Sequence, residues 1–455
     1  MTLAPNISPH RCLGIVLFIA ICGLTACVQF KARPLSVNGS AAAYAGRSLN
    51  DPGLLQFMAE QKATGGTWDV NKLALAAVYY NPEVRVARAL AAESSAAIIT
   101  AGQRPNPVLT FVPAYSPSLG KGIYPFNFQP TLSVTFETAG KRGKRLAQAR
   151  ADAAAGQFRV AAAAWDARTR VRTAMLALYA GRQNAVLLKT EATLHEEALQ
   201  KLKAQVEEGE APALDLTVSR LALNRARLAL HDAERQTTTA REQLAGAVGV
   251  SPEALDAVRL DFSAFENFTA IPAGSARRTA LLHRNDLLAL LGDYSVAEAM
   301  MRLEIAKQYP DIRINPTDQY DHSGNRWGVG ISLDLPILNQ NRGPIAVADA
   351  RRKTAGERFE ARQAAIITEV GSALAAYQTM TAKAATARTL ADEAAHASDT
   401  TRKMVAVGEL IPLDFVRRKI EASASNIALL TARVEAQTAA GQLEAALQMP
   451  LRSVR

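Results

Sequence analysis

Two short stretches of this 455-residue sequence decide the fold, because each describes the same turn between two helices. The first is VEEGEAPALDL, residues 206–216, and the second is VAVGELIPLDF, residues 405–415. Each has a glycine, a proline three or four residues later, and an aspartate between two hydrophobic residues. Gly408 follows Gly209 by 199 residues (408 − 209), and the same spacing separates the two aspartates. The equal spacing indicates an internal duplication.

Each residue type in this turn has a physical role at a junction between helices. Glycine is favoured where a helix ends, because it has no Cβ and adopts the left-handed conformation without strain. Proline cannot continue a helix but fits the start of one, so Pro212 and Pro412 are expected to begin the returning helices. Asp215 and Asp414 then fall in the first turn, where a negative charge favours the positive end of the helix dipole.

Long helices are predicted on both sides of each turn. Residues 143–209 and 343–408 have almost no proline and little glycine, so each is expected to be one helix of roughly 100 Å at 1.5 Å per residue. Hydrophobic residues recur every seven positions on the returning helices, and others match across the repeat before the turns, which predicts coiled-coil packing. They are Leu214, Leu221 and Leu228; Leu413, Ile420, Ile427 and Val434; Val171, Met175 and Leu178; and Val370, Leu374 and Tyr377.

Strands are expected before each long helix, after a short helix that ends at Pro105 or Pro310. Hydrophobic residues alternate with small or polar ones, over a length near the roughly 9–11 residues that a tilted strand needs to cross a bilayer. A half-buried sheet in a soluble domain shows the same alternation, so the strands alone leave both interpretations open. The four runs are residues 108–112, 129–136, 311–320 and 327–335.

Four strands are too few to close a membrane barrel, which needs about eight. An open sheet edge cannot face lipid, because its backbone groups would have no hydrogen-bonding partners there. If the strands lie in a membrane, several chains must therefore share one barrel. Three chains of four strands each would give twelve, although the argument demands an oligomer without fixing the number at three. The predicted fold is mainly α-helical with a small β part.

The N-terminus has the pattern of an export signal. Arg11 precedes an apolar run over residues 12–21, so residues 1–26 are predicted to be a signal peptide. Leu24-Thr25-Ala26-Cys27 resembles a bacterial lipobox, in which the cysteine becomes the lipidated first residue; ordinary cleavage or a helical anchor is the alternative. With Val28 rather than aspartate next, this resemblance implies sorting to the outer membrane. We further expect a lipidated, flexible segment at 27–64, a first repeat at 65–280 and a second repeat at 281–455.

Several classes of function are not expected. The net charge is +10, but Lys and Arg are interleaved with Glu and Asp along the helical stretches, which is typical of solvated helix faces and argues against nucleic-acid binding. Six histidines lack metal-binding spacing, and His322 is expected in a solvated loop. Residues 140–144 lack the spacing and the Ser or Thr of a phosphate-binding loop. With no nucleophile and base pattern, we expect no catalysis, no cofactor and no bound metal.

The duplicated plan resembles the TolC family of outer-membrane efflux channels over residues 65–455. The resemblance implies a homotrimer with a short β-barrel in the outer membrane and a long coiled-coil α-barrel in the periplasm. It also implies that the turns at Gly209, Pro212, Gly408 and Pro412 dock on a periplasmic adaptor (membrane fusion protein), and through it on an inner-membrane pump of the RND type. The residues that carry the resemblance are Asn81-Pro82-Glu83, Arg284-Asn285-Asp286-Leu287, Pro105, Pro310, Leu335-Pro336-Ile337 and the two turns.

One segment is also similar to a branch of that family. Phe136-Glu137-Thr138-Ala139-Gly140-Lys141-Arg142 is similar to the Glu-x-Gly-Gly-Lys-Arg pattern of CzcC-like proteins, with Ala139 in place of the first glycine. This resemblance implies heavy-metal cations as the exported substrate. Drug efflux and type I protein secretion keep the fold and change the substrate, and a periplasmic adaptor with its helical hairpin is a more distant alternative.

Charged residues gather at the two turns. Our hypothesis is that copies of them form a cation-favouring aperture, which acid–base pairs between neighbouring hairpins hold shut. The family resemblance implies that Asp414 faces the pore, whereas the position one turn on, which can also be acidic in the family, is Arg417 here. The alternative is that these residues only cap solvated helix ends. The residues concerned are Glu208, Glu210 and Asp215 at the first turn, and Glu409, Asp414 and Arg417 at the second.

Overall fold

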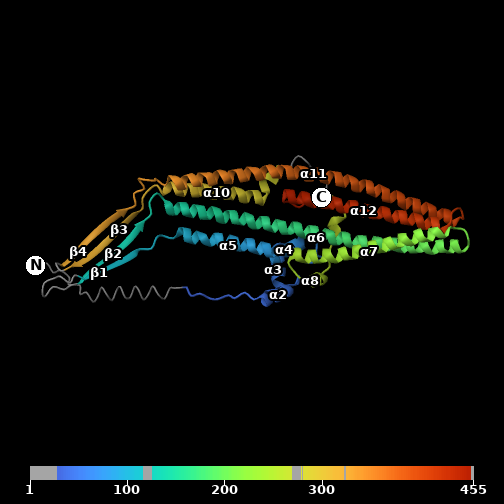
Figure 1. The fold of residues 1–455 in the computed structure, drawn as a ribbon, viewed down its shortest axis with the longest axis horizontal. Helices are drawn as coiled ribbons and strands as arrows, with labels where there is room; N and C mark the ends of the chain where they lie inside the picture. The colour runs from blue at the N-terminus through green and yellow to red at the C-terminus, as the bar shows by residue number, and fades with distance from the viewer. Residues whose placement is uncertain (1–27, 116–125, 269–277, 279, 322–323, 452–455) are drawn as a thin grey trace. The chain divides into compact units, whose positions relative to one another are not determined.

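The computed structural model describes residues 28–115, 126–268, 278, 280–321 and 324–451 (Figure 1). The predicted signal peptide, Cys27 and His322 lie outside these residues, so the predictions made for them stay predictions. The chain forms two compact units, Met1–Gly46 and Arg47–Arg455. In the first unit, helix α2 (Val37–Ala45) begins after Ser36, whose hydroxyl accepts a hydrogen bond from the Gly39 amide at 3.2 Å.

The second unit repeats one order of elements, as the sequence predicts: a short helix, two strands, a long helix and a returning helix. The first copy consists of α5 (Pro82–Gly102), β1 (Val108–Tyr115), β2 (Phe126–Phe136), α6 (Lys141–Glu207) and α7 (Ala213–Val248). The second consists of α10 (Asn285–Ala306), β3 (Ile312–Asp321), β4 (Gly324–Leu333), α11 (Arg342–Ala406) and α12 (Pro412–Leu447). Between the copies lie the short helix α8 (Pro252–Asp256) and the 3-10 turn η1 (Ser263–Phe265).

The four strands form one antiparallel sheet in the order β1-β2-β3-β4. The two repeats meet at β2 and β3, where the hydroxyls of Thr131 and Thr317 lie 3.1 Å apart on opposite strands. β1 continues to Tyr115, past the predicted end at residue 112, and runs through Pro113. A proline is tolerated there because β1 pairs on one side only.

The helices pack side by side, with α10 and α12 between the two long helices α6 and α11. α6 packs against α5 and α7 of its own repeat and against α10 and α12 of the other. α11 packs against α10 and α12. Figure 1 shows α5 and α7 following one another along α6, and α10 and α12 following one another along α11, with the strands at one end and the two turns at the other.

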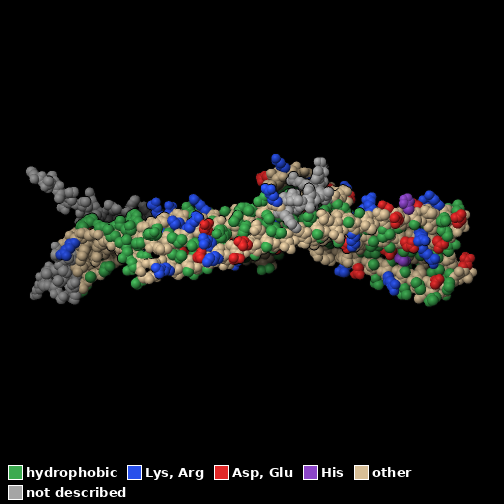
Figure 2. All heavy atoms as spheres, turned by 90° about the horizontal axis from the view of Figure 1, so that it is seen from above, with side chains coloured by type: hydrophobic (Ala, Val, Ile, Leu, Met, Phe, Trp, Pro, Cys, Tyr) green, Lys and Arg blue, Asp and Glu red, His purple; other side chains and the backbone are tan. Residues whose placement is uncertain are grey.

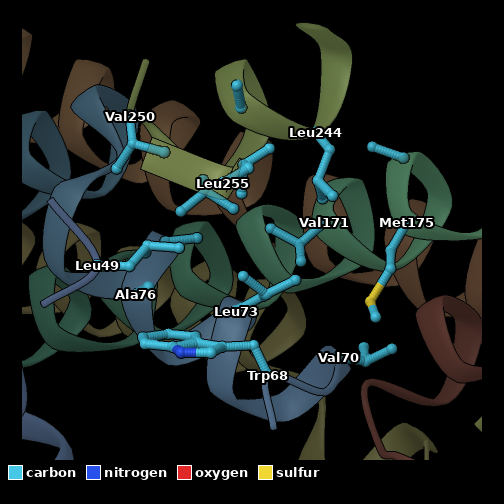
Figure 3. Packing of buried hydrophobic residues seen from close by; sticks show 14 of the residues in the cluster. Leu49, Trp68, Val70, Leu73, Ala76, Val171, Met175, Leu244, Val250 and Leu255 are labelled. Atoms are coloured by element: carbon cyan, nitrogen blue, oxygen red, sulfur yellow. The ribbon is translucent and has the colours of Figure 1, made fainter. Parts of the chain in front are cut away.

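The largest hydrophobic core of the described residues lies around α6 (Figure 3). Val171 and Met175 of α6 and Leu244 of α7 are fully buried there together with Phe265, which is 1% exposed. A second core around Val370 and four neighbours lies between α11 and α12; these neighbours are Ile366, Tyr377, Leu443 and Leu447. The hydrophobic residues that match across the repeat before the turns thus lie in cores, as the sequence predicts, with Leu374 partly buried.

Part of the segment expected to be flexible, residues 27–64, is folded instead. Helix α3 (Pro52–Glu60) begins after Asp51, whose carboxylate accepts a hydrogen bond from the Leu54 amide at 3.0 Å. Leu49 and Leu54 are fully buried in the main core, beside α4 (Val70–Tyr80). The Ala-, Gly- and Ser-rich composition of residues 27–64 indicates a flexible segment. The few apolar side chains that fix it are buried by helices distant in sequence, so composition alone does not predict the fold.

Candidate functional site

The two turns predicted from the sequence have one backbone geometry. Gly209 and Gly408 are left-handed, with φ of 80° and 83°. At the first turn, the Glu210 amide donates to the Gln205 carbonyl at 2.8 Å and the Gly209 amide to the Val206 carbonyl at 3.2 Å. The second turn repeats these bonds, from Glu409 to Met404 at 3.0 Å and from Gly408 to Val405 at 3.2 Å. This pair of hydrogen bonds is a Schellman motif, which satisfies carbonyls at the end of a helix.

The two returning helices begin in register, although their prolines do not. Pro412 is the first residue of α12, whereas Pro212 lies one position before α7, in an extended conformation. Asp215 and Asp414 are each the third residue of their helix. Pro212 thus lies at the start of α7 as its N-cap, and Ala213 occupies the place that Pro412 has in the second repeat.

The surroundings of the two turns differ. Leu413 is 4% exposed and packs with Val416, Ala198 and Leu202, so the second turn rests on the end of α6. Leu214, the equivalent of Leu413, is 72% exposed. Within the described chain, therefore, the first apolar position of α12 is covered and that of α7 is not, although α7 buries Leu223 and Leu244 further along.

The charges at the turns have few partners in the described part of the chain. Asp414 pairs with Arg417 three residues on, at 3.6 Å. Lys419 of α12 lies 3.8 Å from Glu197 of α6, which is a contact between the two hairpins. The other predicted aperture residues, Glu208, Glu210, Asp215 and Glu409, are exposed and have no ion pair with another described residue.

The segment after β2 holds the two repeats together. Lys141 is buried, and its Nζ donates to the Tyr309 carbonyl at 2.6 Å and to Asp311 Oδ1 at 2.7 Å. The Thr138 amide also donates to Asp311 Oδ1, at 2.9 Å. Burial alone would raise the pKa of Asp311, but the hydrogen bonds from Lys141 and Thr138 outweigh it and the pKa is lowered. The Lys of the Glu-x-Gly-Gly-Lys-Arg pattern thus joins β2 and α6 to the start of β3.

The two glycine positions of that pattern have a backbone reason. Ala139 and Gly140 are both left-handed, with φ of 53° and 65°. Glycine adopts this conformation without strain, whereas alanine does not. Ala139 therefore adopts a conformation that glycine would adopt more readily, at some cost in stability.

Sequence reasoning missed a charged network at the start of α10. Arg284 donates to both oxygens of Asp286, at 2.9 and 2.7 Å, to Glu369 at 2.8 Å and to the Ala446 carbonyl at 3.0 Å. Arg362 donates to Asp286 and Glu369 as well. Burial raises the pKa of Asp286, but the hydrogen bonds from the two arginines outweigh it and the pKa is lowered. The sequence singles out the Arg284-Asn285-Asp286-Leu287 segment, but no local pattern marks its partners on α11, Arg362 and Glu369.

The first repeat has a simpler version of this contact. Asn81 Nδ2 donates to the Ala247 carbonyl at 3.0 Å, as Arg284 does to Ala446. Asn81 also caps α5 by accepting a hydrogen bond from the Glu83 amide at 2.9 Å. Both contacts fix the start of a short helix against the end of the returning helix.

Two features are absent from the residues that the structure describes. They contain no group of three or more His, Cys, Asp or Glu side chains that could hold a metal ion. None of the helices in the described ranges has a stretch long and apolar enough to cross a membrane.

Comparison with known proteins agrees with this repeat architecture. The family model of outer membrane efflux proteins matches residues 76–250 and 276–447, one segment for each repeat. The chain belongs to this family. Its members are passive channels and not enzymes, so the expectation of no catalytic activity is confirmed by the family.

Three individual proteins illustrate the relationship. The cobalt-zinc-cadmium resistance protein CzcC of Cupriavidus metallidurans is 23% identical over 238 residues, which are 51% of this chain and 55% of CzcC. A membrane protein from Pseudomonas aeruginosa superposes with a TM-score of 0.70 at 20% identity, over 85% of this chain and 91% of that one. The Campylobacter jejuni CmeC outer membrane channel gives a TM-score of 0.69 at 14% identity, over 94% and 95%. These likenesses in structure show the fold, and the match to CzcC spans about half of each chain.

Proposed function

We propose that this protein is the outer-membrane channel of a tripartite efflux system, a passive duct formed by three copies of the chain. The observation that carries the proposal is that the two repeats pack against each other on one side only. Within the chain, α6 of the first repeat packs against α10 and α12 of the second. In the described residues, α11 has no comparable packing against α5 and α7. If the two repeats pack alike, α11 should also pack against α5 and α7. We infer that those two helices belong to another copy of the chain.

The surface of α7 indicates what that contact would cover. Leu214, Leu221 and Leu228 are 72%, 52% and 66% exposed, although their sevenfold spacing is that of a coiled coil. We call these three residues the α7 stripe. At the equivalent position on α12, Leu413 is covered by α6. In our proposal, α11 of a neighbouring copy covers the α7 stripe in the same way.

The sheet also has two edges without a partner strand in the described chain. Among the described strands, β1 and β4 each pair with one other strand only. Joining β4 of one copy to β1 of the next removes both edges, which lipid would not tolerate. We take three copies because members of this family are trimeric, and family membership supports an outer-membrane location.

The two turns are the end of the channel that we propose meets the periplasmic adaptor and, through it, the RND-type pump. They lie at the opposite end of the helices from the strands (Figure 1). Three copies would bring six such turns together around one axis. Glu208, Glu210 and Glu409 would then line or surround the aperture. The lipidation of Cys27 stays a prediction, and the proposed function does not depend on it.

We propose heavy-metal cations as the exported substrate. The support is the match to CzcC together with the resemblance of residues 136–142 to the CzcC-like pattern. Because no described cluster could hold a metal, the cations would pass through the duct without being bound.

The test is a sensitivity panel on a strain that lacks this protein, with re-expression as control. Zinc, cobalt, cadmium, nickel, copper and silver salts are compared with hydrophobic drugs and detergents. We expect selective loss of metal tolerance. Selective loss of drug tolerance would retain the channel and reject the substrate, and no change in either would point to protein secretion.

A further inference from the structure

Positive charge is concentrated where the long helices leave the strands. Residues 141–153, the start of α6, contain five Lys or Arg and one acidic residue. Residues 342–354, the start of α11, contain four Lys or Arg and one acidic residue. Figure 2 shows Lys and Arg side chains on the helices close to the strands. This excess is not a general property of these helices, because residues 195–207 at the other end of α6 have two Lys and three Glu.

Five exposed arginines in this region have no acidic partner among the residues that the structure describes. We call them the arginine collar: Arg104, Arg142, Arg150, Arg342 and Arg351. Arg142 and Arg342 donate only to neutral oxygens, those of the Gly102 carbonyl at 2.6 Å and of the Gln340 side chain at 3.1 and 2.8 Å. The collar is therefore a set of positive charges that no carboxylate of the described chain neutralises.

Exposed apolar residues lie at the same level. Leu335, Ile337 and Leu338, between β4 and α11, are 64%, 72% and 97% exposed. Apolar side chains beside a row of cations are typical of a segment at the boundary between headgroups and acyl chains. This pattern favours a membrane surface over bulk water as the neighbour of the collar.

The distances along the chain fit a headgroup layer. Arg104 precedes β1 by four residues, and Arg142 lies in the first turn of α6. Arg150 is eight residues further on, or about 12 Å along the helix. Headgroups extend roughly 5–8 Å beyond each side of the hydrocarbon core, and charges act over a Debye length of about 8 Å at physiological salt. An arginine side chain in this range reaches a phosphate directly or through the field near the surface.

We propose that the arginine collar binds the phosphates of anionic phospholipids in the leaflet that borders the helices. The inference rests on the proposed position of the strands in the membrane. Guanidinium suits this partner, because its planar fork of donors matches phosphate oxygens. The collar would fix the depth of the channel in the membrane independently of any lipid on Cys27.

The experiment uses the full protein in detergent, with micelles doped by phosphatidylglycerol or, separately, by phosphatidylcholine. The collar variant carries Arg142→Gln, Arg150→Gln and Arg351→Gln. The control carries Arg220→Gln, Arg225→Gln and Lys403→Gln, which are exposed positions near the turns and remove the same charge. We expect phosphatidylglycerol to raise the melting temperature of the wild type and the control more than phosphatidylcholine does. The collar variant should lose more than half of that difference.

Several results would overturn the proposal. These are an equal response of the wild type to the two lipids, an undiminished preference in the collar variant, and an equal response to free inorganic phosphate. Loss of the trimer with unchanged lipid preference would mean that the collar faces carboxylates of another copy. If the triple variant does not fold, Arg150→Gln alone, at an exposed side chain without a described partner, must still reduce the preference. Channel conductance in planar bilayers is measured in parallel, so that failure of the collar and failure of the channel are distinguishable.

Discussion

The two hairpins of this protein have the same backbone and different surroundings. Gly209 and Gly408 end their helices with the same pair of hydrogen bonds. Yet Leu413 is buried against α6, while Leu214 is exposed. The comparison teaches that local sequence determines the turn, whereas burial depends on which neighbouring helix belongs to the same chain.

The strongest test of this comparison lies where the short helices begin. Arg284→Ala should destabilise the protein by about 3 kcal/mol, because Asp286 and Glu369 lose a buried partner; Glu369 keeps some solvent, which places the effect at the lower end of the usual range. Asn81→Ala removes one cap and one hydrogen bond to a carbonyl, so about 1 kcal/mol is expected. Urea unfolding followed by circular dichroism measures both.

Acid provides a second measurement on the same network. The pKa of Asp286 and that of Glu369 are lowered in the folded state, so their contribution is present above their unfolded pKa values, about 4, and is lost as the pH falls through the folded ones. The wild type should therefore lose stability more steeply below about pH 4 than Asp286→Asn. Equal acid profiles of the two proteins would show that the network does not contribute as described.

The second prediction concerns the returning helices. Leu413→Ala should lower the free energy of unfolding by about 2–3 kcal/mol, because it opens a cavity against Leu202 and Val416. Leu214→Ala should leave the fold of the single chain unchanged and weaken the trimer, since the α7 stripe is exposed until another copy covers it. Sedimentation at decreasing protein concentration separates the two effects. A Leu214→Ala trimer as stable as the wild type would contradict the proposal that α11 of a neighbouring copy covers α7 as α6 covers α12.

The features that the sequence predicts correctly depend on neighbouring residues. Gly209 and Gly408, the aspartates after them and the proline-free stretches between are local signals, so the turns and helices could be located from them. The ends of the strands were less well predicted, because Pro113 lies within β1 and local rules argue against that. The burial of Leu54 and the partners of Arg284 were missed, since both depend on segments far away in sequence. The unequal exposure of Leu214 and Leu413 has no local signal at all.

The third prediction tests the part of the two hairpins that should be equal. Gly209→Ala and Gly408→Ala should each cost about 1–2 kcal/mol, because both positions are left-handed. A Cβ added at either position meets no atom within 4 Å, so the effect is that of the backbone alone. Thermal melting of the two variants should give the same shift. A clearly larger shift for one of them would mean that its turn has a further contact in the assembled protein.

The smallest effect is expected at the charges of the second turn. Asp414 and Arg417 form a partly exposed pair, and such a pair is worth about 0.2–1 kcal/mol, so neither substitution should disturb the fold. Asp414→Ala should reduce the preference for cations in single-channel recordings, and Arg417→Ala should increase it, because each removes one sign of charge from the aperture. Asp215→Ala is the matched variant in the first repeat, with no ion pair in the described chain. If all three variants conduct as the wild type does, these charges only cap solvated helix ends. If only the second-turn variants differ, the pore is lined by the second hairpin, and the two copies of the turn have different functions despite their common backbone.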